Sequence, residues 1–357
     1  MAELTDKYKK IIENNQKAYI DSFVNSAIGK LYKKTGKVSD DISADNYEDM
    51  IRTINCLRAN NCFVSLISNL KRLRFHLNNH IRIKRKCNRY NDYLSIACIV
   101  KNEEIYIAEW IEFHILVGVE RFYIFDNGST DNTRNMLQPY IDRGIVIYID
   151  YPGKAAQINA YNDALRLAGK NTKWLAFVDA DEFIVPVKED DVKSVLREFE
   201  DEPALGVNWI VYGPCGHQHR PEGLVINNYK KTFADRNNEL NCRIKSIVQP
   251  KKTKCMITPH FGIYKKQQFA VNEKHDIITG AAAYVQDGRA CTLVNSVEKI
   301  RINHYWTKSL DELKTKCNRG YPDGTSNPQY ERTLERVNYP LVEDNITDRF
   351  ANKIDVR

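Results

Sequence analysis

The sequence predicts an α/β fold, in which a mainly parallel β-sheet carries helices on both of its faces. Between residues 93 and 179, short apolar runs that suit buried strands alternate with longer stretches of helical periodicity. Repeated β-α-β units of this kind set their strands parallel, because each helix returns the chain to the edge where the previous strand began. The content of 43% hydrophobic and 28% charged residues is that of a globular protein and excludes disordered and collagen-like classes.

Residues 1–90 precede this pattern and predict a helical extension. Its last part, residues 66–90, repeats leucine and isoleucine at helical spacing among clusters of lysine and arginine. A basic amphipathic helix can lie on an anionic membrane surface, and it can equally pack on the following domain with its charges in solvent. The net charge of +7 is modest and no aromatic-rich basic motif is present, so nucleic acid is not an expected partner.

Each element of the alternating region has a local signal. The predicted strands are 93–100, 121–126, 145–150 and 174–179, and the predicted helices between them are 101–118, 132–144 and 155–169. Gly118 ends the first helix, because glycine adopts the left-handed conformation of a helix C-terminus without strain. After Pro186 the predicted elements are a helix at 192–200, strands at 206–213, 243–250, 290–294 and 299–306, and a last helix that starts with a capping box between Ser309 and Glu312.

The sequence also predicts a cytoplasmic location. The N-terminus has no apolar segment of the kind that directs secretion, and no window approaches the roughly 18 to 20 apolar residues that span a bilayer. The nine cysteines are scattered and form no C-x-x-C pair, which favours reduced thiols. Residues 66–90 could bring such a protein to the inner face of the membrane.

Three acidic residues lie at the end of the strand 174–179, namely Asp179, Asp181 and Glu182 in the stretch KWLAFVDADEFIVP. Clustered carboxylates repel one another, and an unpaired charge away from water is costly. A divalent cation resolves both problems, because carboxylates two residues apart at a strand end can reach one hard ion, which then binds diphosphate oxygens. A D-x-D pair also occurs by chance, and its acids then only cap or solvate a turn.

Four ordered blocks of the sequence together resemble glycosyltransferase family 92. The blocks are residues 96–133, 173–186, 208–217 and 301–320. The resemblance implies a GT-A nucleotide-binding fold, a UDP-sugar donor with galactose favoured, Mn²⁺ or Mg²⁺, inversion at the anomeric carbon and a glycan or glycolipid acceptor. We place the catalytic domain at 91–325 and a partly helical C-terminal tail at 326–357. The absence of an anchoring helix favours a role in surface polysaccharide or lipopolysaccharide synthesis.

The resemblance also implies roles for individual residues. Asp126 would contact the base or ribose, and the residues after the first strand would line the nucleotide pocket, namely Val100, Lys101, Asn102 and Glu103. Asp179 and Asp181 would bind the metal together with His304. Further donor contacts would come from Gln157, Asn162, Asp179 and Lys308, with Lys316 and Arg319 nearby. The alternatives are that residues 127–133 only form a turn and helix cap, that His304 is a core histidine, and that the amides and Lys316 face solvent.

Inversion requires a base that removes the proton of the acceptor hydroxyl. Glu222, in the loop after the strand 206–213, is the first candidate, because that strand should run toward the acceptor side; Asp235 and Asp287 are alternatives. His217 and His219 resemble a metal pair but lack a third ligand of recognised spacing, so an acceptor-binding loop or a plain surface loop explains them better.

Two other classes of function use similar residues. A nucleotidyltransferase that makes a nucleotide sugar would also pair acids with Mg²⁺, but it usually has a glycine-rich basic loop for a triphosphate, which IACIVKNEE does not provide. A non-enzymatic glycan- or lipid-binding module would explain the basic segment but not the ordered acidic blocks.

Overall fold

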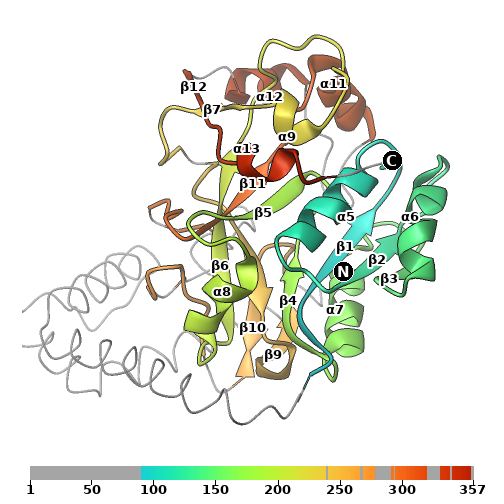
Figure 1. Ribbon diagram of the computed structural model, residues 1–357, viewed down its shortest axis with the longest axis vertical. Coiled ribbons are helices and arrows are strands. Elements are labelled where there is room, and N and C mark those ends of the chain that lie inside the picture. The colour runs from blue at the N-terminus through green and yellow to red at the C-terminus, as the bar shows by residue number, and fades with distance from the viewer. Residues whose placement is uncertain are drawn as a thin grey trace, which may run out of the picture.

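The computed structural model describes residues 90–238, 240–265, 268–276, 278, 291–292, 294–319, 330–337 and 340–354. The predicted helical extension, including the basic segment 66–90, lies outside these residues except for Tyr90, and so does Asp287. The described part is built around one large β-sheet with helices packed against it (Figure 1).

Eight strands form this sheet, in the order β3-β2-β1-β4-β8-β6-β11-β5. The strands are β1 Asp92–Val100, β2 Arg121–Asp126, β3 Val146–Asp150, β4 Thr172–Phe177, β5 Glu182–Pro186, β6 Ala204–Val211, β8 Ile244–Val248 and β11 Ile300–His304. Strands β3, β2, β1 and β4 are parallel neighbours, and β11 is parallel to β6. Strand β8 is antiparallel to both β4 and β6, and β5 is antiparallel to β11. The predicted mainly parallel α/β sheet is therefore confirmed.

Helices cover both faces of β1 (Figure 1). The helices are α5 Ile107–Leu116, α6 Thr133–Asp142, α7 Gln157–Ala168, α8 Val192–Leu196, α9 Val225–Asn228, α11 Leu310–Arg319, α12 Tyr330–Val337 and α13 Asp348–Ala351. Leu94, Ile96 and Cys98 of β1 join the hydrophobic cluster that contains α5, whereas Ala97 and Ile99 join the cluster that contains α7. Because both faces of this strand are buried, its sequence is a continuous apolar run.

The sequence predicted that the first helix begins at residue 101. Helix α5 begins at Ile107 instead. Residues 101–106 form a loop in which Asn102 has a positive φ of 56°. The N–H groups of Asn102, Glu103 and Glu104 donate to side chains of residues 129–133, and these bonds hold the segment as a loop. The other end of α5 agrees with the prediction, because Gly118 has a φ of 99° and donates to the carbonyl of Ile115.

The C-terminal segment belongs to the same core. Strand β12 (Leu341–Glu343) pairs with β7 (Lys231–Phe233), and a second small sheet joins β9 (Thr253–Met256) to β10 (Gly262–Tyr264). Phe350 of α13 packs edge-on against Phe113 of α5, with ring centroids 5.5 Å apart. Residues of the predicted tail therefore help to bury the helix next to the sheet.

The predicted capping box of α11 is confirmed. Ser309 Oγ lies 2.6 Å from Glu312 Oε2, and the same carboxylate oxygen accepts from the Ser309 N–H at 3.1 Å. This helix is not the last one, because α12 and α13 follow it. The strand predicted at 290–294 is wrong for its described residues, where Cys291 makes only an isolated bridge with Arg243.

Candidate functional site

The candidate site lies where parallel strands of the sheet end. Asp126 is the last residue of β2, and His304 is the last residue of β11, directly opposite Glu182 of β5. Asp179 and Asp181 occupy the turn between β4 and β5. Because β2, β4 and β11 run in the same direction, these side chains share one edge of the sheet, as the sequence predicted.

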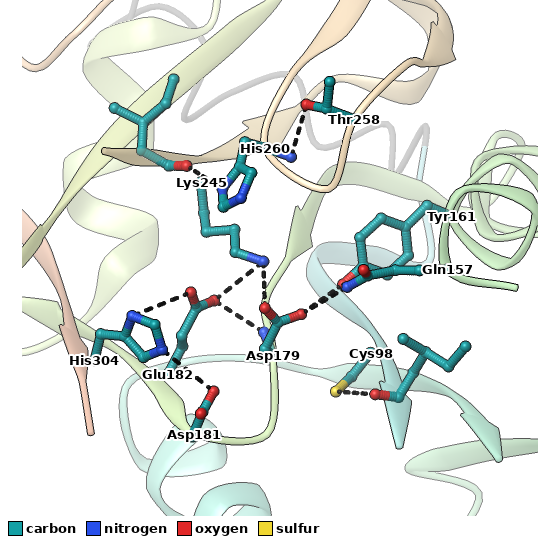
Figure 2. A network of polar contacts seen from close by, with 12 residues as sticks. Cys98, Gln157, Tyr161, Asp179, Asp181, Glu182, Lys245, Thr258, His260 and His304 are labelled. Atoms are coloured by element: carbon teal, nitrogen blue, oxygen red, sulfur yellow. Dashed lines mark hydrogen bonds and ion pairs between the residues drawn. The ribbon is translucent and has the colours of Figure 1, made fainter. Parts of the chain in front are cut away.

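Asp179 pairs with a buried lysine (Figure 2). Lys245 of β8 places its Nζ 2.6 Å from Asp179 Oδ2 and 3.5 Å from Glu182 Oε2, and its side chain is 1% exposed. The other oxygen of Asp179 accepts hydrogen bonds from Gln157 Nε2 at 3.1 Å and from Tyr161 OH at 3.0 Å. Both oxygens of Asp179 are therefore engaged inside the protein.

Burial and charge oppose each other in this group. Burial lowers the pKa of Lys245, but the attraction of Asp179 and Glu182 outweighs it and raises that pKa above its usual value. Burial would raise the pKa of Asp179, yet Lys245 holds it below its usual range. The pKa of Glu182 is well above its usual range, because the side chain is fully buried beside two other acids. Lys245 and Asp179 thus form the ion pair, and Glu182 takes up a proton more readily than an ordinary glutamate.

Asp181 has a different set of partners. Its Oδ1 lies 3.5 Å from His304 Nε2, and its Oδ2 binds the Nζ of Lys316 from α11. Burial would raise the pKa of Asp181, but the charge of Lys316, together with the hydrogen bond from His304, holds it well below its usual value. Burial lowers the pKa of His304 despite the opposing charge of Asp181, which favours the neutral imidazole. The two aspartates therefore pair with different lysines, Asp179 with Lys245 and Asp181 with Lys316.

Asp181 and His304 fit a divalent cation as a pair. An ion with ligand bonds of about 2.1 Å can span the 3.5 Å between His304 Nε2 and Asp181 Oδ1. Behind this pair, His304 Nδ1 and Glu182 Oε1 are buried 4.0 Å apart, and neither has a hydrogen-bond partner among the described residues. A carboxylate on this side of the ring would orient a metal-binding imidazole once the two atoms came within hydrogen-bond distance.

Asp179 does not fit the same ion equally well, because Lys245 occupies its Oδ2. Within the part of the chain that the structure describes, no three His, Cys, Asp or Glu side chains are grouped to hold a metal ion. The structure thus brings together Asp181 and His304, two of the three predicted ligands, and gives the third a lysine as its partner.

Two loops beside Asp126 are joined by hydrogen bonds. Asp126 is 3% exposed and accepts from the Ser129 N–H at 2.7 Å and from Tyr148 OH at 2.8 Å. Asn102 donates its N–H to Ser129 Oγ at 2.9 Å, and its Oδ1 accepts from the Thr130 N–H at 2.8 Å. Residues 101–104 and 126–133 therefore form one rim at the ends of β1 and β2, which we call the β1–β2 rim.

The same rim caps helix α6. The Glu103 N–H donates to Thr133 Oγ1 at 2.8 Å, and Asp131 Oδ1 accepts from the Thr133 N–H at 3.0 Å. Residues 127–133 therefore do form the turn and helix cap that the sequence analysis gave as their alternative role. This role does not prevent the same residues from contacting a nucleotide. Val100 is buried and Lys101 is exposed at the edge of the rim.

The remaining predicted donor contacts have distinct positions. Gln157 donates to Asp179, whereas Asn162 exchanges two hydrogen bonds of 2.9 Å with the main chain of Met256 and so ties α7 to β9. Lys308 has a positive φ of 50°, and its Nζ lies 3.6 Å from the ring centre of Tyr106. Burial lowers the pKa of Lys308, although nearby acids oppose the shift.

Comparison with known proteins places this site in a family. The family model "Glycosyltransferase family 92" matches residues 93–321, which is more than half of the chain and includes both aspartates and His304. The chain belongs to glycosyltransferase family 92. This membership agrees with the GT-A fold class predicted from the sequence and with the mixed sheet observed.

Two curated relatives align over part of their length. A family 92 protein of Ricinus communis is 30% identical over 163 residues, which covers 44% of this chain and 28% of that protein. The galactan β-1,4-galactosyltransferase GALS3 of Arabidopsis thaliana is 33% identical over 106 residues, which covers 27% of this chain and 21% of that protein. The aligned parts thus span less than a third of these relatives. Among solved structures, S. aureus TarS in complex with UDP is 16% identical, with a TM-score of 0.31 over 44% of this chain and 47% of that one.

The catalytic base of this family 92 chain stays a prediction. Glu222 and Asp235 are both exposed in loops. His217 and His219 do not face a common ligand, because His217 Nε2 lies 3.3 Å from a main-chain carbonyl and His219 Nδ1 lies 2.7 Å from Asp311 Oδ2. Over the described ranges, no helix has the length and apolar character needed to cross a membrane, and the cytoplasmic location stays a prediction.

Two buried charged residues of the family 92 chain were missed by the sequence analysis. Lys245 interrupts the apolar strand IKSIV, and a lysine in such a strand signals a buried acidic partner. Glu109 lies in the apolar helix α5 and accepts the N–H groups of Val225 and Ile226. A charged residue within an apolar strand or helix could have drawn attention to both positions. The sequence could not have shown that Lys245 pairs with Asp179 or that Glu109 binds the N–H groups of residues 225 and 226.

Proposed function

We propose that this chain is a metal-dependent, inverting glycosyltransferase that transfers a sugar, with galactose favoured, from a UDP-sugar to a glycan acceptor. The observation that carries the proposal is the pair of Asp181 and His304, 3.5 Å apart at the strand ends within the range that matches family 92. The activity named for GALS3 supports galactose as the sugar. A role in polysaccharide or lipopolysaccharide synthesis extends the same proposal.

In this proposal the donor binds across the strand ends. Asp181 and His304 hold the divalent ion, which neutralises negative charge on the departing diphosphate when it is bound. Lys316, which pairs with Asp181, and Lys308 add positive charge at the same edge. The β1–β2 rim, with Asp126 at its base, binds the nucleoside through main-chain groups and the aspartate.

The acceptor side lies along the loop that follows β6. Its main-chain carbonyls at His217 and Gln218 accept from the N–H groups of Leu310 and Asp311, both at 3.1 Å, which holds the loop against the start of α11. Glu222 in this loop is the proposed base, since an exposed carboxylate there can take the proton of the acceptor hydroxyl.

Incubation of the purified protein with UDP-galactose and Mn²⁺ tests the proposal. We expect release of UDP that depends on Mn²⁺ and that Asp181→Asn lowers by about tenfold or more, because the amide is a weaker ligand for a hard cation. Asp348→Asn is the matched control, because Asp348 forms a surface ion pair with Lys230 at 2.5 Å, and it should keep full activity.

Two results would contradict the proposal. Release of pyrophosphate from a nucleoside triphosphate, without UDP release from any UDP-sugar, would identify a nucleotidyltransferase. Binding of UDP that is indifferent to Mn²⁺ and unaffected by Asp181→Ala would indicate a non-enzymatic binding module.

A further inference from the structure

His260 lies beside the acidic cluster, in the turn between β9 and β10, with its ring next to the Lys245 side chain (Figure 2). Its Nδ1 is 2.9 Å from the main-chain carbonyl oxygen of Ile244, the residue before Lys245. The pairing of β8 with β4 stops at Ile247, so Ile244 lies beyond the reach of β4 and alongside the acidic turn that follows that strand. His260 and Asp179 therefore belong to the same edge of the sheet.

Two further hydrogen bonds fix the position of His260. Its main-chain N–H donates to Thr258 Oγ1 at 3.1 Å, and its carbonyl oxygen accepts from Ser246 Oγ at 2.6 Å. The indole of Trp209 packs edge-on against the His260 ring, with centroids 5.3 Å apart, and against the His304 ring at 4.3 Å. One tryptophan thus lies between His260 and the histidine that is proposed to bind the metal ion.

The contacts of the ring also fix its protonation. A carbonyl oxygen only accepts, so Nδ1 carries the ring proton and donates it to Ile244. Burial of most of the ring and the charge of Lys245 lower the pKa of His260 to about 3 from 6.5, which keeps the imidazole neutral. Nε2 therefore holds a lone pair. Among the described residues none hydrogen-bonds to this atom, and His260 is partly exposed, so the lone pair is available to a ligand.

We propose that His260 is a specificity-determining residue whose Nε2 accepts a hydrogen bond from one hydroxyl of the sugar that is transferred. The inference rests on the proposed function, which brings a UDP-sugar to this edge. In the sheet, β8 lies between β1 and β2, whose rim is proposed to bind the nucleoside, and β11, which carries His304. A donor that reaches from the rim to the metal ion therefore passes the end of β8, where His260 stands.

The chemistry of Nε2 selects a hydroxyl as its partner. Diphosphate oxygens only accept hydrogen bonds, so a lone pair opposes them, whereas a sugar hydroxyl can donate. The ammonium of Lys245 is 1% exposed and does not compete for this hydroxyl. A neutral imidazole with so low a pKa is also a weak base, which leaves removal of the acceptor proton to a carboxylate.

Two substitutions separate the two ring nitrogens of His260. His260→Asn places an amide where Nδ1 stands and can still donate to the Ile244 carbonyl, but it has no atom at Nε2. His260→Gln places an amide near Nε2 and can still accept, but it leaves that carbonyl without its donor. His260→Asn should lower kcat/KM for UDP release from UDP-galactose about fivefold, the loss of one hydrogen bond, and His260→Gln should retain most of it. A merely structural role of the ring predicts the opposite order.

UDP-galactose analogues that lack one hydroxyl, at C2, C3, C4 or C6, identify the partner. For one of them, the wild type should lose about fivefold in kcat/KM, and His260→Asn should lose nothing further. The affinity for UDP with Mn²⁺, measured by calorimetry, should be the same in both proteins. His275→Asn is the control and should change none of these values, because His275 stacks on Phe199 outside the site and has a positive φ of 64° that asparagine tolerates.

His260→Phe replaces His260→Asn if the latter does not fold, because it keeps an aromatic ring without an acceptor. The inference is overturned if no analogue couples to His260, or if the variant loses as much affinity for UDP as for UDP-galactose. A wild type that neither binds UDP nor releases it from UDP-galactose overturns the proposed function instead, because the inference fails on its own only when the wild type is active.

Discussion

Replacement of Glu109 by glutamine should change how stability depends on pH. Glu109 lies on α5, is 4% exposed, and accepts the N–H groups of Val225 at 2.8 Å and of Ile226 at 3.1 Å. It therefore anchors the start of α9 and the loop that contains Glu222. Burial raises its pKa to about 7 from the usual 4.5, although the two N–H groups act in the opposite direction.

The magnitude follows from this difference in pKa. The difference between a pKa of 4.5 in the unfolded chain and about 7 in the folded protein, at about 1.4 kcal/mol for each pH unit, corresponds to about 3 kcal/mol. Between the unfolded and folded pKa values, the native state binds a proton that the unfolded state has released, so the free energy of unfolding falls as pH rises. This contribution is fully present below about pH 4.5 and is lost above about pH 7.

Glutamine does not titrate, so Glu109→Gln removes this slope. Urea unfolding followed by tryptophan fluorescence, from about pH 4.5 to 8, should show the free-energy difference between variant and wild type moving by about 3 kcal/mol in favour of the variant. The lost hydrogen bond adds an offset that is constant with pH. Glu109→Asp keeps a titrating carboxylate and should retain the slope. A difference between wild type and Glu109→Gln that stays flat over this range would refute the reasoning.

Two other substitutions test the core near the site. Burial lowers the pKa of His114 to about 3 from 6.5, so the free energy of unfolding falls as pH falls below 6.5. In urea titrations, the wild type should lose about 2 kcal/mol more than His114→Gln between pH 6.5 and 5. Equal losses in the two proteins would contradict this. Asp344→Asn should cost about 3 to 5 kcal/mol in thermal or urea unfolding, because it breaks a buried, bidentate pair with Arg301. The exposed Asp348→Asn should cost less than about 1 kcal/mol, and equal costs would count against the role of burial.

The elements that the sequence predicts well have local causes. Strand β2 was predicted with its observed bounds, because its apolar run is buried and ends at a turn-forming segment. Gly118 and the Ser309–Glu312 capping box also mark helix ends through contacts within a few residues. Asp126 and Asp179 were placed on one edge correctly, since parallel topology determines where strands end.

The features that were missed depend on residues far apart in the sequence. Strand β5 follows the acidic turn directly and exists because it pairs with β11, more than a hundred residues later. Residues 101–106 have helical character, but side chains of the β1–β2 rim bind their N–H groups and hold them in a loop. The partnership of Asp179 with Lys245 is fixed by the register of β8 against β4, which no local pattern records.

The insertion of β8 between β4 and β6 also affects the order of folding. Asp179 and Lys245 are separated by 66 residues, and Asp181 and Lys316 by 135. During synthesis the β3-β2-β1-β4 half can form early, but its β4 edge stays unpaired until residues 244–248 have emerged from the ribosome. The acidic turn therefore cannot gain either neutralising lysine before residues 245 and 316 have been synthesised. A nascent chain that stalls before β8 therefore presents a bare strand edge, a substrate for chaperones and a starting point for aggregation.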